Sequence, residues 1–198
     1  MTAPGDHPLP PAGGITGSLA LTRIPKNRTW FRLYRHPYAP LHFGTTRRAR
    51  FDAARGEFGV LYVARQIAGA FVETLARGGV RTISQERLQR YRIAEIAASR
   101  VVSLVDLTGT GLVRMGVDGR LTTGAYQIAQ RWSSAFFAHR DRPDGILYGS
   151  RHDPGQQLAA LFDRTAPCLT ATLHGPLRDH LGHDAFFRLL DDYDIGLL

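Results

Sequence analysis

Two kinds of apolar spacing, one typical of strands and one typical of helices, follow each other along this chain, and their order restricts the possible folds more than any other feature of the sequence. Short apolar or alternating runs are typical of strands, and they occupy the segments 29–34, 59–64, 101–107, 145–148, 157–162 and 169–173. Apolar residues three or four positions apart indicate helices near 65–77, 85–97, 112–116, 125–139 and 185–190. The two kinds do not alternate as regular strand–helix–strand units, and no segment repeats. We therefore predict an α+β fold, a single domain of mixed sheets with packed helices.

Polar residues and glycines predict where several helices begin or end. Gly78-Gly79 should stop the helix near 65–77, because glycine readily takes the left-handed conformation that follows a helix. Ser84 is a typical N-cap for the helix 85–97, and Thr122 or Thr123 is a typical N-cap for the helix 125–139.

Length and composition restrict the class of protein. The 198 residues suit one domain, with residues 1–18 as a flexible Pro- and Gly-containing tail and residues 19–198 as the domain. No apolar run reaches the roughly 18–20 residues that cross a bilayer, and the N-terminal segment lacks the apolar centre of a secretory signal. The single cysteine, Cys168, excludes an internal disulfide. We expect a soluble, cytoplasmic protein.

Positive charge is concentrated in one early segment. The whole chain has a formal net charge of +8, and segment 23–55 alone carries +8, because nine basic residues face one acid, Asp52. The basic residues are Arg23, Lys26, Arg28, Arg32, Arg35, Arg47, Arg48, Arg50 and Arg55. Arginine favours bidentate binding of phosphates. Most of these residues are expected to form a solvated face, and one or two to bind a phosphate.

Familiar phosphate and metal motifs are absent from the sequence. Neither Gly-x-x-x-x-Gly-Lys-[Ser/Thr] nor Gly-x-Gly-x-x-Gly lies between a strand and a helix. The histidines lack the spacing His-Glu-x-x-His, and His174, His180 and His183 near the C-terminus are better explained as solvated side chains than as ligands. We expect no metal site.

Four polar residues occupy positions where a polar side chain needs an explanation. Arg32 lies in a predicted strand, where an unpaired charge is costly, so that it either reaches the surface or holds an anion. Tyr62 lies in the next strand, Glu73 lies on or beside the apolar face of the following helix, and Ser150 lies just past a strand end. Each also has a purely structural explanation: Glu73 could pair with Arg77 one turn on, Tyr62 could be core, and Ser150 could be a turn residue.

The order of these residues resembles the RES-domain family, the toxin halves of bacterial toxin–antitoxin pairs, named for an arginine, a glutamate and a serine. Arg32 in TWFRLY, Glu73 in LYVARQIAGAFVETLAR and Ser150 in DGILYGSRHD match these three. The segment RARFDAARGEFGVLYVA is similar to the family's Arg-aromatic segment and Leu-Tyr strand, and adds Arg50 and Tyr62.

A further segment, TGAYQIAQRWSSAF, resembles the family's helix before the serine and covers Tyr126 and Trp132. With this segment the resemblance extends over about 30–162. It implies an ADP-ribosyltransferase-like fold and an activity on NAD, which is a substrate, so that no cofactor is expected.

The resemblance also implies roles for the matched residues. Cleavage of the nicotinamide–ribose bond builds positive charge on C1′, and a fixed carboxylate, Glu73, would stabilise it. Arg32 and Arg50 would bind the pyrophosphate. Tyr62, with Tyr126 as a second candidate, would contact the nicotinamide, and Ser150 would hydrogen-bond ribose or phosphate rather than act as a nucleophile.

Three fates of the ADP-ribose remain open at this stage. Hydrolysis, phosphorolysis and transfer to a protein share the same bond cleavage. The family also implies an Xre-type antitoxin as partner, and hence a hetero-oligomer. Two other classes compete with the enzyme: a basic nucleic-acid-binding module, suggested by a pI near 10.3, and a partner-binding protein without activity. The chain lacks a helix-turn-helix signature or an aromatic platform, so direct nucleic-acid binding is not expected.

Overall fold

The computed structural model describes residues 9–198, and the first eight residues of the expected tail lie outside this range. Residues 9–18 include no helix or strand. The strands are β1 (Leu21–Ile24), β2 (Trp30–Arg35), β3 (Val60–Ala64), β4 (Thr82–Ile83), β5 (Tyr91–Ala98), β6 (Val102–Leu107), β7 (Gly145–Gly149), β8 (Gln157–Phe162), β9 (Leu169–Leu173) and β10 (Gly196–Leu197). The helices are α1 (Ile67–Thr74), α2 (Gln85–Gln89), α3 (Thr110–Arg114), α4 (Arg120–Thr123), α5 (Tyr126–Ala138), α6 (Leu177–Leu181) and α7 (His183–Asp192), with a 3-10 turn, η1, at Asp163–Cys168.

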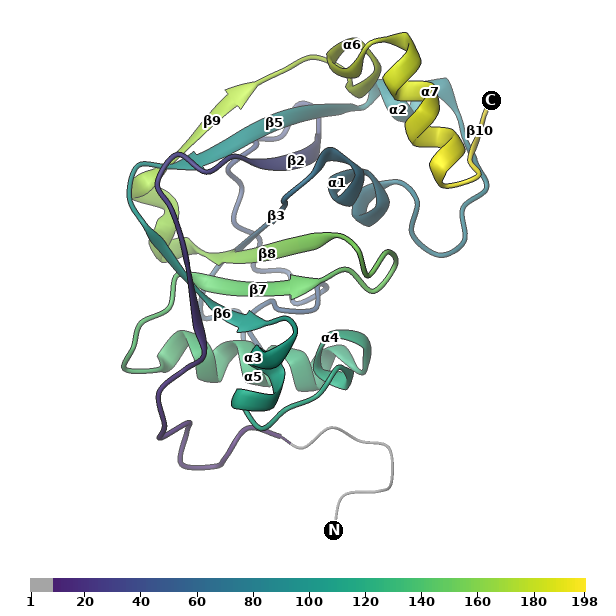
Figure 1. Ribbon diagram of the computed structural model, residues 1–198. Coiled ribbons are helices and arrows are strands. Elements are labelled where there is room, and N and C mark those ends of the chain that lie inside the picture. Colours follow the sequence, from purple (N-terminus) through teal and green to yellow (C-terminus); the bar gives the residue numbers. More distant parts are fainter. Residues whose placement is uncertain (1–8) are drawn as a thin grey trace.

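One large mixed sheet organises the molecule (Figure 1). Its strand order is β1-β6-β7-β8-β3-β2-β5-β9, and β4 with β10 forms a separate two-stranded parallel sheet. Within the large sheet β6 and β7 are parallel, and the chain between them forms α3, α4 and α5. Its other neighbouring strands are antiparallel. This mixture confirms the predicted α+β class.

The large sheet is nearly split between β2 and β3. These strands share one registered pair, Phe31 with Ala64, whereas β2 pairs with β5 over six positions and β3 with β8 over five. Figure 1 shows β2, β5 and β9 diverging from β3, β8 and β7, with α1 beside the divergence. Side chains rather than strand pairing therefore fill the space between the two halves.

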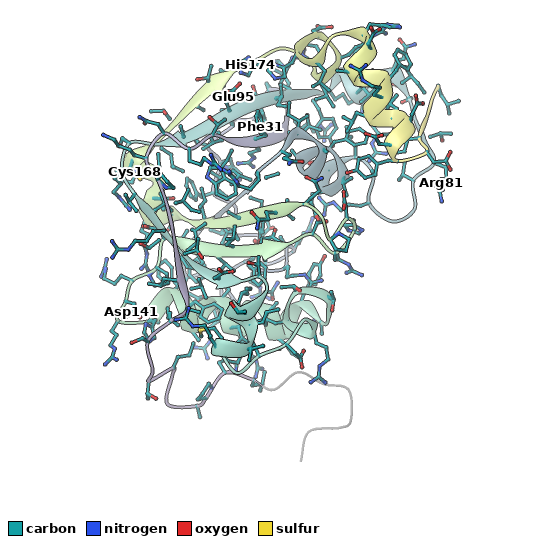
Figure 2. All side chains as sticks on the ribbon, viewed as in Figure 1. Phe31, Arg81, Glu95, Asp141, Cys168 and His174 are labelled. Atoms are coloured by element: carbon teal, nitrogen blue, oxygen red, sulfur yellow. The ribbon has the colours of Figure 1, made fainter. Side chains whose placement is uncertain are left out.

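Apolar side chains pack on both faces of the sheet. The larger cluster joins α1, α5 and α7 to one face through buried residues such as Phe71, Phe136 and Phe186. A second cluster covers the other face and includes Trp30 and Leu161. Figure 2 shows side chains on both faces of the sheet and labels Phe31 on β2. Among residues 9–198 no helix is long and apolar enough to cross a membrane.

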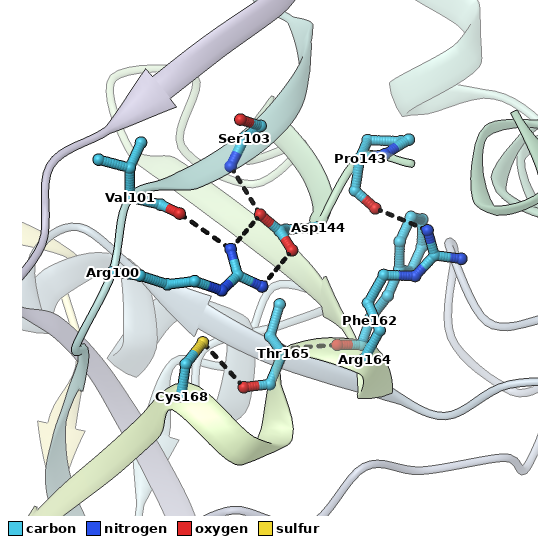
Figure 3. Close-up of polar contacts among 9 residues, drawn as sticks. All are labelled: Arg100, Val101, Ser103, Pro143, Asp144, Phe162, Arg164, Thr165 and Cys168. Atoms are coloured by element: carbon cyan, nitrogen blue, oxygen red, sulfur yellow. Dashed lines mark hydrogen bonds and ion pairs between the residues drawn. The ribbon is translucent and has the colours of Figure 1, made fainter. Parts of the chain in front are cut away.

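An ion pair fixes the start of β7. Arg100 donates from Nη1 to Asp144 Oδ2 (2.8 Å) and from Nη2 to Asp144 Oδ1 (2.7 Å), as Figure 3 shows. The same carboxylate accepts the backbone N–H of Ser103 at 2.9 Å, so that it connects β6 to the start of β7. The strand β7 begins directly after Asp144 and ends at Gly149, the residue before the candidate site residue Ser150.

The structure corrects the helix predicted over 85–97. The helix α2 ends at Gln89, and the strand β5 begins at Tyr91. The N-cap prediction for Ser84 is confirmed, since its Oγ accepts the N–H of Arg87 at 3.2 Å. The apolar residues of the second half have strand spacing as well as helical spacing, and β5 is held between β2 and β9, where tertiary pairing outweighs local propensity.

The predicted cap of the helix 125–139 is also wrong. Thr122 and Thr123 belong to the preceding short helix α4, where their hydroxyls donate to Gly119 O at 2.9 and 3.0 Å. The helix α5 begins after Ala125, which provides no side-chain cap. Threonine hydroxyls can bond back to the carbonyl three or four residues earlier, and here that local bond competes successfully with capping.

The other predicted strands agree with the structure to within one residue at each end, and β8 and β9 have the predicted bounds. Helix α1 is shorter than the segment 65–77, α3 lies two residues before the predicted 112–116, and α7 is longer than 185–190 at both ends. The short strands β1, β4 and β10 were not predicted.

Candidate functional site

A cavity of about 390 Å³ opens where the sheet splits. Residues from β2, β3, α1, the start of α5 and the end of β7 line it. Of the six residues singled out in the sequence, five line this cavity: Arg32, Arg50, Tyr62, Glu73 and Tyr126. The sixth, Ser150, is 4% exposed and does not line it, but contacts Glu73 directly.

Glu73 lies in the last turn of α1, and a hydrogen bond from Ser150 holds its side chain. Ser150 Oγ donates a hydrogen bond of 2.6 Å to Glu73 Oε1. The same Oγ accepts the backbone N–H groups of His152 (3.0 Å) and Asp153 (3.1 Å). A hydroxyl has one proton to donate and two lone pairs, so its proton is used in the bond to the carboxylate and its lone pairs in the bonds from the backbone. In this arrangement Ser150 positions Glu73 rather than offering a free nucleophile.

The ion pair considered for Glu73 and Arg77 does not form in the described part of the chain. The salt bridges within 4.0 Å involve other residues, although Arg77 does line the same cavity. The second oxygen of Glu73 has no hydrogen bond to any of the described residues, so it is free to face a ligand.

Arg50 is a buried cation with an incomplete set of partners. It is 6% exposed, donates from Nη1 to Gly124 O at 2.8 Å, and lies with Cζ 4.5 Å from the ring centre of Tyr126. Its Nη2 is buried and has no hydrogen-bond partner among the described residues. Burial lowers the pKa of Arg50 from its ordinary value. A buried donor without an acceptor is costly, and an anionic ligand in the cavity would supply one.

Arg32 donates hydrogen bonds to backbone carbonyls of the loop after β2 and not to a carboxylate. Its Nη1 donates to Pro40 O at 2.7 Å and to His42 O at 3.1 Å, which holds the segment after β2 against the cavity. Burial lowers the pKa of Arg32 to about 10. Among the described residues no acid forms an ion pair with it, so its positive charge contributes to the cavity without being neutralised.

Tyr62 lines the cavity, and its hydroxyl forms hydrogen bonds with the turn that contains Arg50. Its hydroxyl donates to Asp52 Oδ1 at 3.0 Å and accepts the N–H of Phe51 at 2.9 Å. Asp52 is 2% exposed and also accepts the N–H of Ala49 at 3.0 Å. Burial, reinforced by Asp52, raises the pKa of Tyr62 well above its ordinary value. The turn 49–52 is therefore fixed on both sides of Arg50.

Sequence reasoning missed several residues of this site. Asp52 was noted as the single acid of the basic segment, which was the signal available for its role as a partner. Tyr148 lines the cavity, and burial raises the pKa of its hydroxyl. Arg151 and His152 also line it, and they directly follow Ser150 in the segment DGILYGSRHD.

The basic segment divides into two groups. Arg32, Arg35 and Arg50 line the cavity, although Arg35 is also exposed. The other six basic residues of segment 23–55 are exposed and do not line the cavity: Arg23, Lys26, Arg28, Arg47, Arg48 and Arg55. The cavity thus combines the carboxylate of Glu73 with several arginines, because Arg77 and Arg151 line it as well. Among residues 9–198 no group of three or more His, Cys, Asp or Glu is arranged to hold a metal ion.

The fold and the cavity define an α+β domain with a ligand-sized site between a fixed carboxylate and several arginines. The RES domain family matches residues 21–180. A relative named "Probable toxin y4kH", from Sinorhizobium fredii, is 33% identical over 112 residues, which are 56% of this chain and 86% of the relative. The chain therefore belongs to the RES-domain family, toxin components of toxin–antitoxin systems.

A solved structure has the same fold. It is a chain in the crystal structure of the M. tuberculosis MbcT-MbcA toxin–antitoxin complex, with a TM-score of 0.60 over 87% of this chain and 91% of that chain. The sequence identity is 17%, so this likeness concerns the fold alone.

Proposed function

We propose that this RES-domain protein cleaves the nicotinamide–ribose bond of NAD in the cavity at the sheet split. The observation that carries the proposal is the pairing, across one cavity, of a carboxylate fixed by Ser150 with a buried guanidinium whose Nη2 has no partner. NAD offers a complementary pair of features. Its pyrophosphate is anionic, and its ribose C1′ becomes positively charged as the bond to nicotinamide breaks.

In the proposed reaction, three groups of residues bind the pyrophosphate, stabilise the transition state and contact the nicotinamide ring. Arg50 and Arg32 bind the pyrophosphate and so fix the dinucleotide. Glu73 faces the ribose and stabilises the oxocarbenium-like transition state through its free oxygen. Tyr62 and Tyr126 provide flat apolar surface for the nicotinamide ring.

The bond that breaks is the one between C1′ and the pyridinium nitrogen. Its electron pair leaves with neutral nicotinamide, and an acceptor oxygen or nitrogen then forms a bond to C1′ and loses a proton. Water, phosphate or a protein side chain can each act as the acceptor, so glycohydrolase, phosphorylase and ADP-ribosyltransferase activities are three outcomes of one cleavage.

The proposal includes a partner. The neighbouring structure is described as a toxin–antitoxin complex, and by analogy this chain would bind an antitoxin, of Xre type, that blocks the cavity in a hetero-oligomer. A cytoplasmic site of action fits a substrate such as NAD.

The test is incubation of the partner-free chain with NAD while nicotinamide release is followed by chromatography. Separate reactions contain buffer alone, in which water is the acceptor, or added phosphate, or candidate protein acceptors, and the mass of the ADP-ribosyl product identifies the acceptor. We expect stoichiometric loss of NAD and gain of nicotinamide in at least one reaction. Intact NAD in every reaction would reject the proposal.

A further inference from the structure

The strand β9 forms an unprotected edge of the large sheet. It pairs with β5 on one side, and none of the described residues pairs with its other side. Figure 1 shows β9 at the outer margin of the sheet, and Figure 2 labels Cys168 and His174, which flank it. An exposed edge strand is a ready template for a further strand, and proteins normally protect such edges.

The register shows which backbone groups point outward. In an antiparallel pair, the two partners alternate between hydrogen-bonded and non-hydrogen-bonded positions. Ser99 N donates to Cys168 O at 2.9 Å and His174 N donates to Ile93 O at 3.0 Å, so the even-numbered residues of this stretch bond to β5. The N–H and C=O groups of Leu169, Ala171 and Leu173 therefore point away from the sheet.

The opposite edge of the sheet is protected in a way that β9 is not. That edge is β1, which carries the exposed Arg23 and is followed by Pro25 and Lys26. Charges and proline at an edge discourage the addition of a strand. By contrast, β9 itself contains neither a charged residue nor a proline, and Leu173 is 59% exposed.

The sequence of β9 reads the same in both directions, Leu-Thr-Ala-Thr-Leu. An antiparallel pairing of two copies about Ala171 therefore places leucine opposite leucine, threonine opposite threonine and alanine opposite alanine. The outward-facing residues then form three hydrogen-bonded pairs with two bonds each. No charge meets a like charge, and the exposed Leu173 of each copy packs against Leu169 of the other.

We infer that β9 is a dimerisation edge, at which two copies of this chain join their large sheets through a twofold axis at Ala171. Such an isologous contact requires a self-complementary surface, which the palindromic strand supplies. The edge lies outside the NAD cavity, because no residue of β9 lines that cavity. The inference therefore does not depend on the proposed reaction.

Two double variants of the full chain test the contact through cross-strand charge. Thr170 and Thr172 are exposed and would face each other across the axis. Thr170→Lys with Thr172→Lys sets like charges directly opposite twice, whereas Thr170→Glu with Thr172→Lys sets opposite charges there and keeps a lysine, not a second acid, opposite Glu95 on β5. Sedimentation equilibrium measures the dimer, and circular dichroism with denaturant unfolding checks that each variant is folded. Ala171→Pro is a third variant, which removes the central outward N–H without touching the ladder to β5.

We expect the unmodified 21.9 kDa chain to dimerise, and the double-lysine variant to dissociate with a dimer Kd raised by about tenfold or more. The glutamate–lysine variant should remain a dimer, and high salt should partly restore the double-lysine dimer. A monomeric unmodified chain, equal dimerisation of both double variants, or an unaffected Ala171→Pro dimer would overturn the inference. Nicotinamide release in the monomeric variant is a separate readout, and its presence or absence bears on the proposed reaction alone.

Discussion

The two walls of the cavity differ in how completely their polar groups are satisfied. On the α1 side, Glu73 is held by Ser150, whose Oγ is itself fixed by two backbone N–H groups. On the arginine wall, Arg50 is buried with one nitrogen unpartnered, and Arg32 bonds to carbonyls without an acid. The carboxylate wall is therefore fixed before any ligand binds, whereas the arginine wall would gain its missing acceptor from the anionic substrate that we propose.

Glu73→Gln is expected to have the largest effect, because it removes the charge that faces C1′ and keeps the shape of the side chain. The rate of nicotinamide release should fall by about 100-fold or more. Steady-state kinetics measure it, with Glu86→Gln as a matched control at an exposed glutamate outside the cavity. Equal rates for the two variants would show that the carboxylate wall does not act in the reaction.

Arg50→Met should weaken binding rather than the chemical step. The loss of charge-assisted hydrogen bonds worth about 1.5–3 kcal/mol predicts a KM for NAD raised by about 10- to 100-fold. Because the free protein leaves this cation partly unpaired, the free energy of unfolding should change by less than about 1 kcal/mol. Arg48→Met, at an exposed arginine, is the control. A large fall in stability with an unchanged KM would make Arg50 a structural residue.

Ser150→Ala should separate the positioning of Glu73 from the binding of substrate. Without the bond to Oε1, the carboxylate loses its fixed orientation, so we expect kcat to fall by about tenfold with little change in KM. Two backbone N–H groups also lose their acceptor, which should lower the free energy of unfolding by about 1–3 kcal/mol. The exposed Ser99→Ala serves as control. If KM rises while kcat holds, Ser150 contacts substrate instead.

Tyr148→Phe should have the smallest effect, confined to high pH. Burial raises the pKa of Tyr148 above the ordinary value of 10.0, so above that pH the unfolded chain releases a proton that the folded chain keeps. Stability should therefore fall as pH rises past 10, by up to about 1.4 kcal/mol per pH unit for this group. Denaturant unfolding between pH 9 and 11 should show a shallower fall in the variant. Parallel curves would show that Tyr148 is not shielded from water.

The secondary structure was predictable where the local spacing of apolar residues fitted only a strand or only a helix. The apolar runs that became β3, β7 and β8 are too short for helices and are bounded by turn residues, and their ends were predicted closely. The stretch of β5 failed because Leu88 and Ile96 fit a helical face, while pairing with β2 and β9 decided the outcome. The spacing of apolar residues within one segment does not show which distant segments will pair as strands.

The site was predictable by resemblance more than by chemistry. The order of Arg32, Glu73 and Ser150 indicated the family, yet nothing local showed that Ser150 would bond Glu73 across 77 positions. The same holds for Arg50 and Gly124, which are 74 positions apart. Asp52 could be noticed as an isolated acid, but its partner Tyr62 is apparent only in the folded chain.

Calorimetric titration of NAD into the Glu73→Gln variant, alone and combined with Arg50→Met, measures directly whether the cavity binds NAD. If the cavity binds NAD between a catalytic carboxylate and a binding arginine, the single variant should bind NAD without consuming it. The double variant should then bind about 10- to 100-fold more weakly. No binding by the single variant would show that the cavity does not bind NAD, and equal binding by both variants would show that Arg50 does not contribute to NAD binding.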